Sequence, residues 1–366
     1  MERIRVRSGA FPYDVVVGRG AWRALKSFPV GNYSSIFVLT EGGLWKRWGE
    51  TFCRESGLRN PGLVLIPSGE RSKALRMVER VASGLLSQGA DRRSLLIAMG
   101  GGVVGDLGGF VASTYMRGID YVQVPTTVVA QVDSAIGGKT AVDVGAMKNL
   151  VGTFYPPRLV LAEPLVLASL GERTFRSGLY EVLKHAILAG PRFFALMEKS
   201  LDSLRPQNGR LLAPILARAA RVKVEVVSRD EREGNLRRVL NLGHTIGHAL
   251  EEATRYRRFL HGEAVGWGMM GSFRIGARLG LLKPAEENRM VRLIRRVGPL
   301  PPIKDLEAEK ILALLPRDKK AVSGNLHWVI VVRIGKVRIV SDVPTEVVRA
   351  ALEDLKHGSA EHRAAN

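Results

Sequence analysis

Short apolar runs alternate with helical segments in the first half of this chain, and that alternation restricts the possible folds more than any other feature. Runs rich in β-branched and aliphatic residues predict four strands, at Ser35–Thr40, Gly62–Ile66, Ser94–Met99 and Tyr121–Val124. Between the second and third runs, the segment Lys73–Gln88 carries apolar residues at helical spacing. Strand, helix and strand in this order predict a parallel α/β sheet.

The pattern changes near Pro164, where long helical segments replace the strands. Helices are predicted over residues 177–189, 211–226, 245–253 and 263–279, and a strand hairpin is predicted over His327–Val332 and Val337–Val340. A chain of 366 residues exceeds the ~100–200 residues of one typical domain. We therefore predict an α/β domain over 1–170, a mainly helical domain over 171–356 and a polar, frayed tail over 357–366.

Composition limits the class of protein but leaves its partners open. The net charge of +20 is compatible with nucleic acid, a membrane surface, anionic small molecules or a solvated surface. Cys53 is the single cysteine, which excludes an internal disulfide and a thiolate zinc cluster and favours a reducing compartment. The N-terminal residues lack the apolar core of a signal peptide, and the least polar window, Ser94–Ser113, contains Asp106 and many glycines. A cytoplasmic location is expected.

A glycine-rich turn follows the predicted strand Ser94–Met99 directly. Gly100, Gly102 and Gly105 have the G-x-G-x-x-G spacing, which lets backbone amides face a pyrophosphate at a helix N-terminus. The pattern alone is equally compatible with glycines that only pack a helix on a sheet. A second loop, Asp133–Thr140, resembles a Walker A loop but has Asp133 in place of the first glycine, where a carboxylate would repel phosphate. A nucleotide triphosphatase is therefore disfavoured, while Lys139, Lys148 and Asn149 remain candidates for holding a smaller anion or a polyol.

Three of the seven histidines lie close together in the sequence, at His244, His248 and His261. His244 and His248 share one helix face, so they could both bind a metal, or one could bind while the other transfers protons. The HExxH protease pattern is absent because no glutamate follows His244. Glu181, on an otherwise apolar stretch near Lys184, is the leading candidate for a carboxylate ligand. A histidine pair with a purely structural role remains the alternative.

Eight ordered segments together resemble the 3-dehydroquinate synthase family. They are SGERSK (68–73), GGGVVGDLGGFVASTYMRGI (100–119), VPTTVVAQVDSAIGGKTAVD (124–143), KNLVGTFYPP (148–157), EVLK (181–184), LNLGHTIGHALE (240–251), HGEAV (261–265) and DKK (318–320). The resemblance extends from about Glu41 to Lys320. It implies an N-terminal Rossmann-like nucleotide-binding α/β domain and a mainly α-helical C-terminal domain for metal and substrate, with the site in the cleft between them.

The resemblance also implies NAD, one divalent metal (zinc, with cobalt as an alternative) and a homodimer. It assigns the metal ligands to Glu181, His244 and His261. It assigns the NAD contacts to Ser68, Gly69, Glu70, Lys73, Gly101, Gly102, Val103, Val104, Gly105, Asp106, Thr126, Thr127, Lys139, Lys148 and Ser169. The family usually has an aspartate that holds the adenosine ribose, and Glu41 occupies that place in this chain.

Family members convert 3-deoxy-D-arabino-heptulosonate 7-phosphate into 3-dehydroquinate and phosphate by oxidation, phosphate elimination, reduction, ring opening and aldol closure. The substrate-binding residues implied are Arg117, Lys139, Asn149, Arg237 and Lys320, and the catalytic group comprises Lys184, His248, Asn241, Asp133 and Lys223. Arg237 suits the carboxylate, because its guanidinium can bind a carboxylate through two parallel hydrogen bonds. Arg117 is expected to reach the phosphate from a partner subunit.

Three alternatives compete with this interpretation. Another NAD- and metal-dependent sugar-phosphate cyclase would alter the carboxylate-binding positions, which are intact here. A polyol dehydrogenase would release NADH in proportion to product. A nucleic-acid-binding protein would cluster its basic residues with aromatics, which form only 6% of this chain. The expected partner is thus a small phosphorylated sugar acid, with neither nucleic acid nor membrane.

Overall fold

The chain folds into two compact units. The computed structural model describes residues 1–7, 9, 11–145, 147–315 and 326–358. Unit 1 comprises Met1–Gly171 and Arg205–Arg232, and unit 2 comprises Glu172–Leu204 and Glu233–Asn366, each taken over its described residues. The chain first passes from unit 1 to unit 2 after Gly171, within one residue of the expected domain boundary.

The assignment of Arg205–Arg232 to the second domain is wrong. This segment contains helix α6 (Gly209–Arg229), whose buried face includes Leu212, Ile215 and Leu216. That face packs on strand β1 (Glu2–Val6) and on two short helical segments of unit 1, η5 (Ala130–Ser134) and η6 (Pro164–Ser169). The apolar stripe of a helix shows that the helix is covered but does not reveal which core covers it, and this explains the error.

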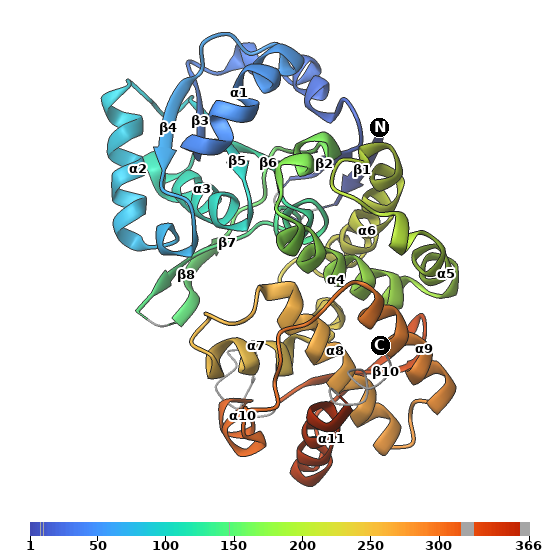
Figure 1. The fold of residues 1–366 in the computed structure, drawn as a ribbon. Coiled ribbons are helices and arrows are strands. Elements are labelled where there is room, and N and C mark those ends of the chain that lie inside the picture. The colour runs from blue at the N-terminus through green and yellow to red at the C-terminus, as the bar shows by residue number, and fades with distance from the viewer. Residues whose placement is uncertain (8, 10, 146, 316–325, 359–366) are drawn as a thin grey trace. The chain divides into compact units, whose positions relative to one another are not determined.

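Within the described residues, unit 1 is built around a seven-stranded sheet of order β1-β2-β9-β6-β5-β3-β4 (Figure 1). All neighbours are parallel except β1, which pairs antiparallel with β2. The strands are β1 (Glu2–Val6), β2 (Tyr13–Val17), β3 (Ile36–Glu41), β4 (Gly62–Ile66), β5 (Leu95–Gly100), β6 (Asp120–Pro125) and β9 (Leu159–Ala162). The four predicted strands are confirmed to within one residue, and the parallel α/β sheet with them.

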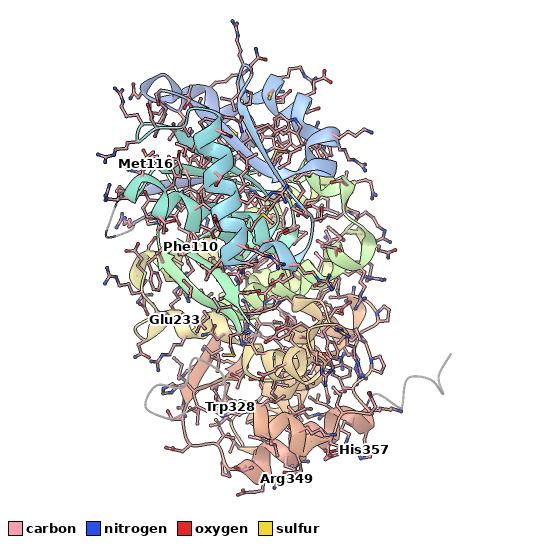
Figure 2. All side chains as sticks on the ribbon, turned by 90° about the vertical axis from the view of Figure 1, so that its left-hand side faces the viewer. Phe110, Met116, Glu233, Trp328, Arg349 and His357 are labelled. Carbon is pink, nitrogen blue, oxygen red and sulfur yellow. The ribbon has the colours of Figure 1, made fainter. Side chains whose placement is uncertain are left out.

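Every residue of the inner strand β5 is buried, because helices cover the sheet. The helices of this unit are α1 (Gly42–Ser56), α2 (Leu75–Ser87), α3 (Gly102–Thr114) and α6. Leu39 of β3, Ala98 of β5 and Val81 of α2 lie in one buried cluster, to which α3 contributes Phe110 (Figure 2). Alternate residues of each strand thus face α2 and α3, as the period of two requires.

The order of the strands fixes where a ligand would bind. After β3 the chain adds β4 on one side of β3 and then returns to add β5 on its other side. In such doubly wound sheets the crevice lies outside the carboxyl ends of the two strands at this reversal. Those ends are Glu41 and Gly100, and the register pairs Thr40 with Met99. A hairpin of β7 (Lys139–Val144) and β8 (Met147–Phe154) forms a separate small sheet in the same unit.

Unit 2 is mainly helical, as expected. Its helices are α4 (Glu172–Ala189), α5 (Pro191–Ser200), α7 (His244–Ala253), α8 (His261–Arg278), α9 (Pro284–Arg296), α10 (Ala308–Leu314) and α11 (Thr345–Gly358). The predicted hairpin is confirmed as β10 (Trp328–Arg333) and β11 (Lys336–Val340), with Trp328 buried (Figure 2). The predicted tail begins too early, because α11 continues through His357. Among the described residues, no helix is long and apolar enough to cross a membrane.

Candidate functional site

The glycine-rich turn lies between β5 and α3, at the reversal of the sheet. Gly101 caps α3, and the first helical hydrogen bond runs from Gly105 N to Gly101 O. The amides at the start of a helix have no partner within the helix, and the helix dipole favours an anion there. The turn therefore has the backbone of a phosphate-binding site.

Gly105 of the same motif, and Gly108 farther along α3, serve packing. A Cβ added to Gly105 would lie 2.7 Å from Oε1 of the buried Gln123, and one added to Gly108 would lie 2.8 Å from Cβ of Ala98. These positions let α3 approach β5 and β6 closely. The two interpretations of the motif are thus both supported, each at different glycines.

Glu41 ends β3 and precedes α1, beside the turn. Ser68 Oγ donates a hydrogen bond of 2.8 Å to Glu41 Oε2, which fixes the carboxylate at the carboxyl end of the sheet. An acidic side chain in this position can accept hydrogen bonds from ribose hydroxyls. Gly69, the residue after Ser68, has a positive φ of 100°.

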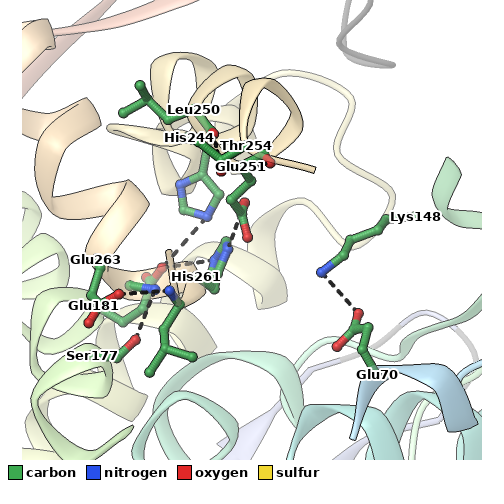
Figure 3. A network of polar contacts seen from close by, with 12 residues as sticks. Glu70, Lys148, Ser177, Glu181, His244, Leu250, Glu251, Thr254, His261 and Glu263 are labelled. Carbon is green, nitrogen blue, oxygen red and sulfur yellow. Dashed lines mark hydrogen bonds and ion pairs between the residues drawn. The ribbon is translucent and has the colours of Figure 1, made fainter. Parts of the chain in front are cut away.

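The other residues expected to contact NAD in this unit have defined partners. Thr126 N donates to Gly100 O at 2.9 Å, and Ala130 N donates to Thr127 Oγ1 at 3.2 Å. Ser169 Oγ accepts from Trp48 Nε1 at 3.1 Å. Lys148 Nζ lies 3.0 Å from Glu70 Oε1 (Figure 3).

The buried Lys73 contacts less buried polar residues of α3 and β8. Its Nζ is 2.5 Å from Asp106 Oδ2 and also donates to Asn149 Oδ1. Burial alone would lower the pKa of Lys73, but the charge of Asp106 and the hydrogen bond to it raise the pKa above its ordinary value. Lys73 is therefore a fixed cation. Asn149 has a left-handed backbone with φ of 52°, and its N–H donates to Asp143 Oδ1 at 2.7 Å.

Two of the predicted catalytic residues meet in unit 1. Lys223 of α6 forms an ion pair with Asp133 of the π-helical segment η5 (Ala130–Ser134). Lys139 is exposed at the start of β7. Arg117 is exposed and has a φ of 68°, in a turn where the exposed Met116 also has a positive φ (Figure 2).

A metal-type donor set lies on three helices of unit 2. Glu181 of α4 is fully buried, and its Oε1 is 3.3 Å from Nε2 of His261 and 3.7 Å from Nε2 of His244 (Figure 3). The three donor atoms lie within 4.8 Å of one another. Metal–ligand distances of about 2.0–2.2 Å in a tetrahedron place neighbouring ligand atoms about 3.3–3.6 Å apart. Two imidazoles and one carboxylate at these separations fit a zinc-like ion.

Glycines allow the three helices to come this close. A Cβ on Gly262, next to His261, would lie 2.7 Å from the carbonyl carbon of Ser177, which is one turn before Glu181. A Cβ on Gly243, which precedes His244 and has a φ of 83°, would lie 2.7 Å from Val265 O. At these candidate ligands the backbone of α8 thus lies close to α4 and to the start of α7.

The charges around the donor set are balanced by neighbours. Lys184 Nζ, fully buried on α4, is 2.5 Å from Glu181 Oε2. Burial alone would lower the pKa of His261, but the charge of Glu251, with the hydrogen bonds to Glu181 and Glu251, raises it to about 10. Because a metal binds the neutral imidazole, binding an ion here would release a proton.

The remaining predicted residues of this unit lie on or beside α7. Arg237 is buried in the short helix η8 (Leu236–Asn241), and Asn241 Nδ2 donates to Glu233 Oε1 at 2.7 Å. The ring of His248 is 5.4 Å from that of His244 and 6.1 Å from that of His261, centroid to centroid. Lys320 lies outside the described residues.

Sequence reasoning missed Glu251, whose Oε2 is 3.4 Å from Nδ1 of His261. Its only signal in the sequence is its place on the face of His244 and His248, seven and three residues later. It also missed Asp143, which holds Asn149, because the hairpin containing both was not predicted.

Comparisons with known proteins agree over most of the chain. The family model described as 3-dehydroquinate synthase N-terminal matches residues 63–177, and the one described as 3-dehydroquinate synthase C-terminal matches residues 178–321. A 3-dehydroquinate synthase of Koribacter versatilis (strain Ellin345) is 43% identical over 364 residues, which cover 98% of this chain and 99% of that protein.

Two solved structures are similar to this chain over nearly its whole length. ValA, a 2-epi-5-epi-valiolone synthase from Streptomyces hygroscopicus subsp. jinggangensis 5008 with NAD+ and Zn2+ bound, is 30% identical, with a TM-score of 0.83 over 94% of this chain and 97% of that one. A 2-deoxy-scyllo-inosose synthase complexed with carbaglucose-6-phosphate, NAD+ and Co2+ shares the fold at 24% identity, with a TM-score of 0.85 over 96% of this chain and 99% of that one. By its two matching family models and its near full-length relatives, the chain belongs to the 3-dehydroquinate synthase family.

Proposed function

We propose that this chain converts 3-deoxy-D-arabino-heptulosonate 7-phosphate into 3-dehydroquinate and phosphate, a step of the shikimate route to aromatic amino acids. The observation that carries the proposal is the buried donor set of Glu181, His244 and His261, in a chain that matches both halves of the family. Near full-length relatives with this name support the same reaction.

The cofactors proposed are NAD and one divalent metal, zinc in preference to cobalt. When bound, NAD would accept and return a hydride, and the metal would polarise substrate hydroxyls. Glu41 would hold the adenosine ribose, and the amides of Gly101–Val104 would bind the pyrophosphate at the start of α3. Glu181, His244 and His261 would hold the metal. The solved relatives with NAD+ and Zn2+ or Co2+ bound support this pair of cofactors.

We assign the anionic ends of the substrate to cationic and amide side chains. Arg237 would bind the carboxylate through two parallel hydrogen bonds, since its guanidinium is planar. Lys139, Asn149 and Arg117 would bind the phosphate, together with Lys320 from outside the described residues. Arg117 would act from the partner subunit of a homodimer.

We assign the hydroxyls of the substrate to ion-paired groups. Lys223 and Asp133 form one such pair, and each can donate to or accept from a hydroxyl without losing its fixed position. Lys184 would donate to a hydroxyl while it balances Glu181. His248 and Asn241 would organise the leaving phosphate and bound water, so that the substrate's own phosphate can take the proton. The lone Cys53 supports a cytoplasmic location.

The test is phosphate release from 3-deoxy-D-arabino-heptulosonate 7-phosphate by the purified protein with NAD and zinc. We expect turnover that a chelator abolishes and that zinc restores. Glu181→Gln should abolish turnover through loss of metal, while Glu172→Gln, at the exposed start of the same helix, should not. Full turnover of Glu181→Gln without bound metal would contradict the site.

One other function has specific support, the cyclisation of a different sugar phosphate, because ValA is 30% identical over nearly the whole chain. Turnover of a heptulose phosphate that lacks the carboxylate distinguishes this function from the 3-dehydroquinate synthase reaction. We expect efficient turnover only of the carboxylate-bearing substrate, since Arg237 is present. Preference for the substrate without the carboxylate would favour the alternative.

A further inference from the structure

The imidazole of His261 lies between two carboxylates. Its Nε2 is 3.3 Å from Glu181 Oε1, and its Nδ1 is 3.4 Å from Glu251 Oε2 (Figure 3). Glu251 is only 5% exposed, on helix α7, which packs against helix α8 of His261. A neutral imidazole has one N–H and one lone pair, so it can donate to only one of these two acceptors.

A metal held by Glu181, His244 and His261 requires the lone pair of His261 on Nε2, the atom that faces Glu181. The single proton of the neutral ring must then be on Nδ1, where Glu251 is the acceptor. We infer that Glu251 is a positioning residue that fixes the tautomer and the orientation of His261 and thereby strengthens the metal site. This inference rests on the metal site of the proposed function.

The two histidine ligands have different outer partners. The Nδ1 of His244 is 3.3 Å from the backbone carbonyl of Leu242, which is neutral, whereas the Nδ1 of His261 faces a carboxylate. A carboxylate acceptor raises the basicity of the coordinating nitrogen more than a neutral carbonyl does, because a hydrogen bond to a charged group is stronger. Glu251 therefore makes His261 the stronger of the two imidazole donors.

The same residues allow a competing arrangement. His248, Glu251 and His261 also bring donor atoms within 4.8 Å of one another, so Glu251 could itself be a ligand. The two arrangements differ in the nitrogen of His261 that binds the ion. Glu181 and His244 favour Nε2, because two donors from two other helices already face it.

The experiment measures zinc affinity of the metal-free protein by competition with a chromophoric chelator, with no substrate present. Outer partners of metal ligands typically contribute about 10–100-fold to affinity. We expect Glu251→Gln, which keeps the shape and a neutral acceptor, to weaken zinc binding about 10-fold, and Glu251→Ala to weaken it by up to about 100-fold. The matched control is Glu252→Gln, the next residue of the same helix, which should retain the wild-type affinity.

A second readout follows the ring itself. With ¹⁵N-labelled histidine, the zinc-loaded wild type should give a His261 signal protonated at Nδ1, with the proton strongly deshielded, and Glu251→Gln should reduce that deshielding. The signal is assigned by its absence in His261→Asn. A purely structural role of Glu251 would leave the proton shift unchanged in a folded Glu251→Gln protein.

Wild-type zinc affinity in both Glu251 variants would overturn the inference. So would complete loss of zinc in Glu251→Gln with retention in Glu181→Gln, because Glu251 would then be a ligand. Zinc binding is measured apart from turnover, so a failure of the proposed reaction would show as absent phosphate release in a wild type that still binds zinc.

Discussion

Replacing Gly262 by alanine should move the proposed metal ligands apart without substituting any of them. The new Cβ would overlap the carbonyl oxygen of Ser177 and would lie 2.7 Å from its carbonyl carbon and 2.9 Å from its Oγ. Two carbons approach favourably only to about 3.5 Å, so α8 must move away from α4 by at least about 0.8 Å (3.5 − 2.7). The backbone of Ser177 cannot yield as the end of a flexible side chain could.

This displacement acts directly on the donor set, because Gly262 follows His261 and Ser177 precedes Glu181 by one turn. A shift of at least about 0.8 Å along the line between His261 Nε2 and Glu181 Oε1 would widen their separation from 3.3 Å to about 4.1 Å or more, beyond the ~3.3–3.6 Å of tetrahedral ligands. Loss of an outer partner of a ligand typically costs about 10–100-fold in metal affinity. Losing one of the three protein ligands themselves should therefore weaken zinc binding by at least about 100-fold.

The same change should also lower the free energy of unfolding. Overpacking costs about 1–3 kcal/mol. The hydrogen bond of 3.1 Å from Gly262 N to Ser177 Oγ is lost as well, for about 1 kcal/mol, while alanine recovers about 1 kcal/mol of helix propensity. The net loss expected is about 1–3 kcal/mol.

Zinc competition and urea unfolding of the metal-free protein measure the two effects. The matched control is Gly84→Ala in the last turn of α2, where the new Cβ would meet Val64 at an ordinary 3.5 Å. That variant should keep its zinc affinity and gain up to about 1 kcal/mol. A Gly262→Ala protein with the zinc affinity and unfolding free energy of the wild type would refute the claim that helix approach sets the site.

Three further predictions concern other parts of the chain. Glu41→Ala should weaken NAD binding about 10-fold in calorimetry through loss of charge-assisted hydrogen bonds, and Glu41→Asp should largely retain it; equal affinity in all three proteins would contradict the ribose assignment. Arg237→Ala should raise the KM about 30-fold or more for the carboxylate-bearing substrate but leave the binding of a carboxylate-free analogue unchanged, and an equal effect on both would exclude a carboxylate role. Burial opposes ionisation of Asp14, yet hydrogen bonds and charges from Arg5 and Arg3 hold its pKa below the ordinary value. Its contribution to the free energy of unfolding is therefore present above the unfolded pKa and is lost as pH falls through the folded pKa. Asp14→Asn should therefore cost about 1 kcal/mol in urea unfolding at neutral pH and progressively less toward about pH 3, and a pH-independent difference would count against the ion pairs.

The elements that the sequence predicted well are those with a strong local pattern. The strand Gly62–Ile66 was placed without error, and the helix predicted over 73–88 is α2 with its ends shifted by one or two residues. Apolar residues at a clear period of two or 3.6 identify such elements without any knowledge of their neighbours.

Elements without such a pattern were missed. Most residues of β8 are exposed, and its partner β7 begins at the end of the stretch that resembles a Walker A loop. Strand β9 has only four residues, and its identity depends on pairing with β2 and β6 from distant parts of the chain. These strands are defined by long-range pairing and not by their own composition.

In the candidate site, too, residues with a local sequence pattern could be predicted, and residues that depend on long-range contacts could not. His244 and His248 could be found from the spacing of one helix, and Glu181 from a charge on an apolar stretch. Glu251 could not, because its role depends on α8 lying against α7, and that approach depends on glycines such as Gly243 whose contacts are invisible in the sequence.

The most direct test of the account is the number of phosphates released per NAD. The protein is freed of NAD, loaded with zinc and given one equivalent of NAD with excess 3-deoxy-D-arabino-heptulosonate 7-phosphate. We expect many phosphates per NAD while the NADH absorbance stays flat, because the hydride taken from the substrate is returned to it. Phosphate release that stops near one per NAD, with NADH accumulating in step, would contradict the account and indicate a dehydrogenase.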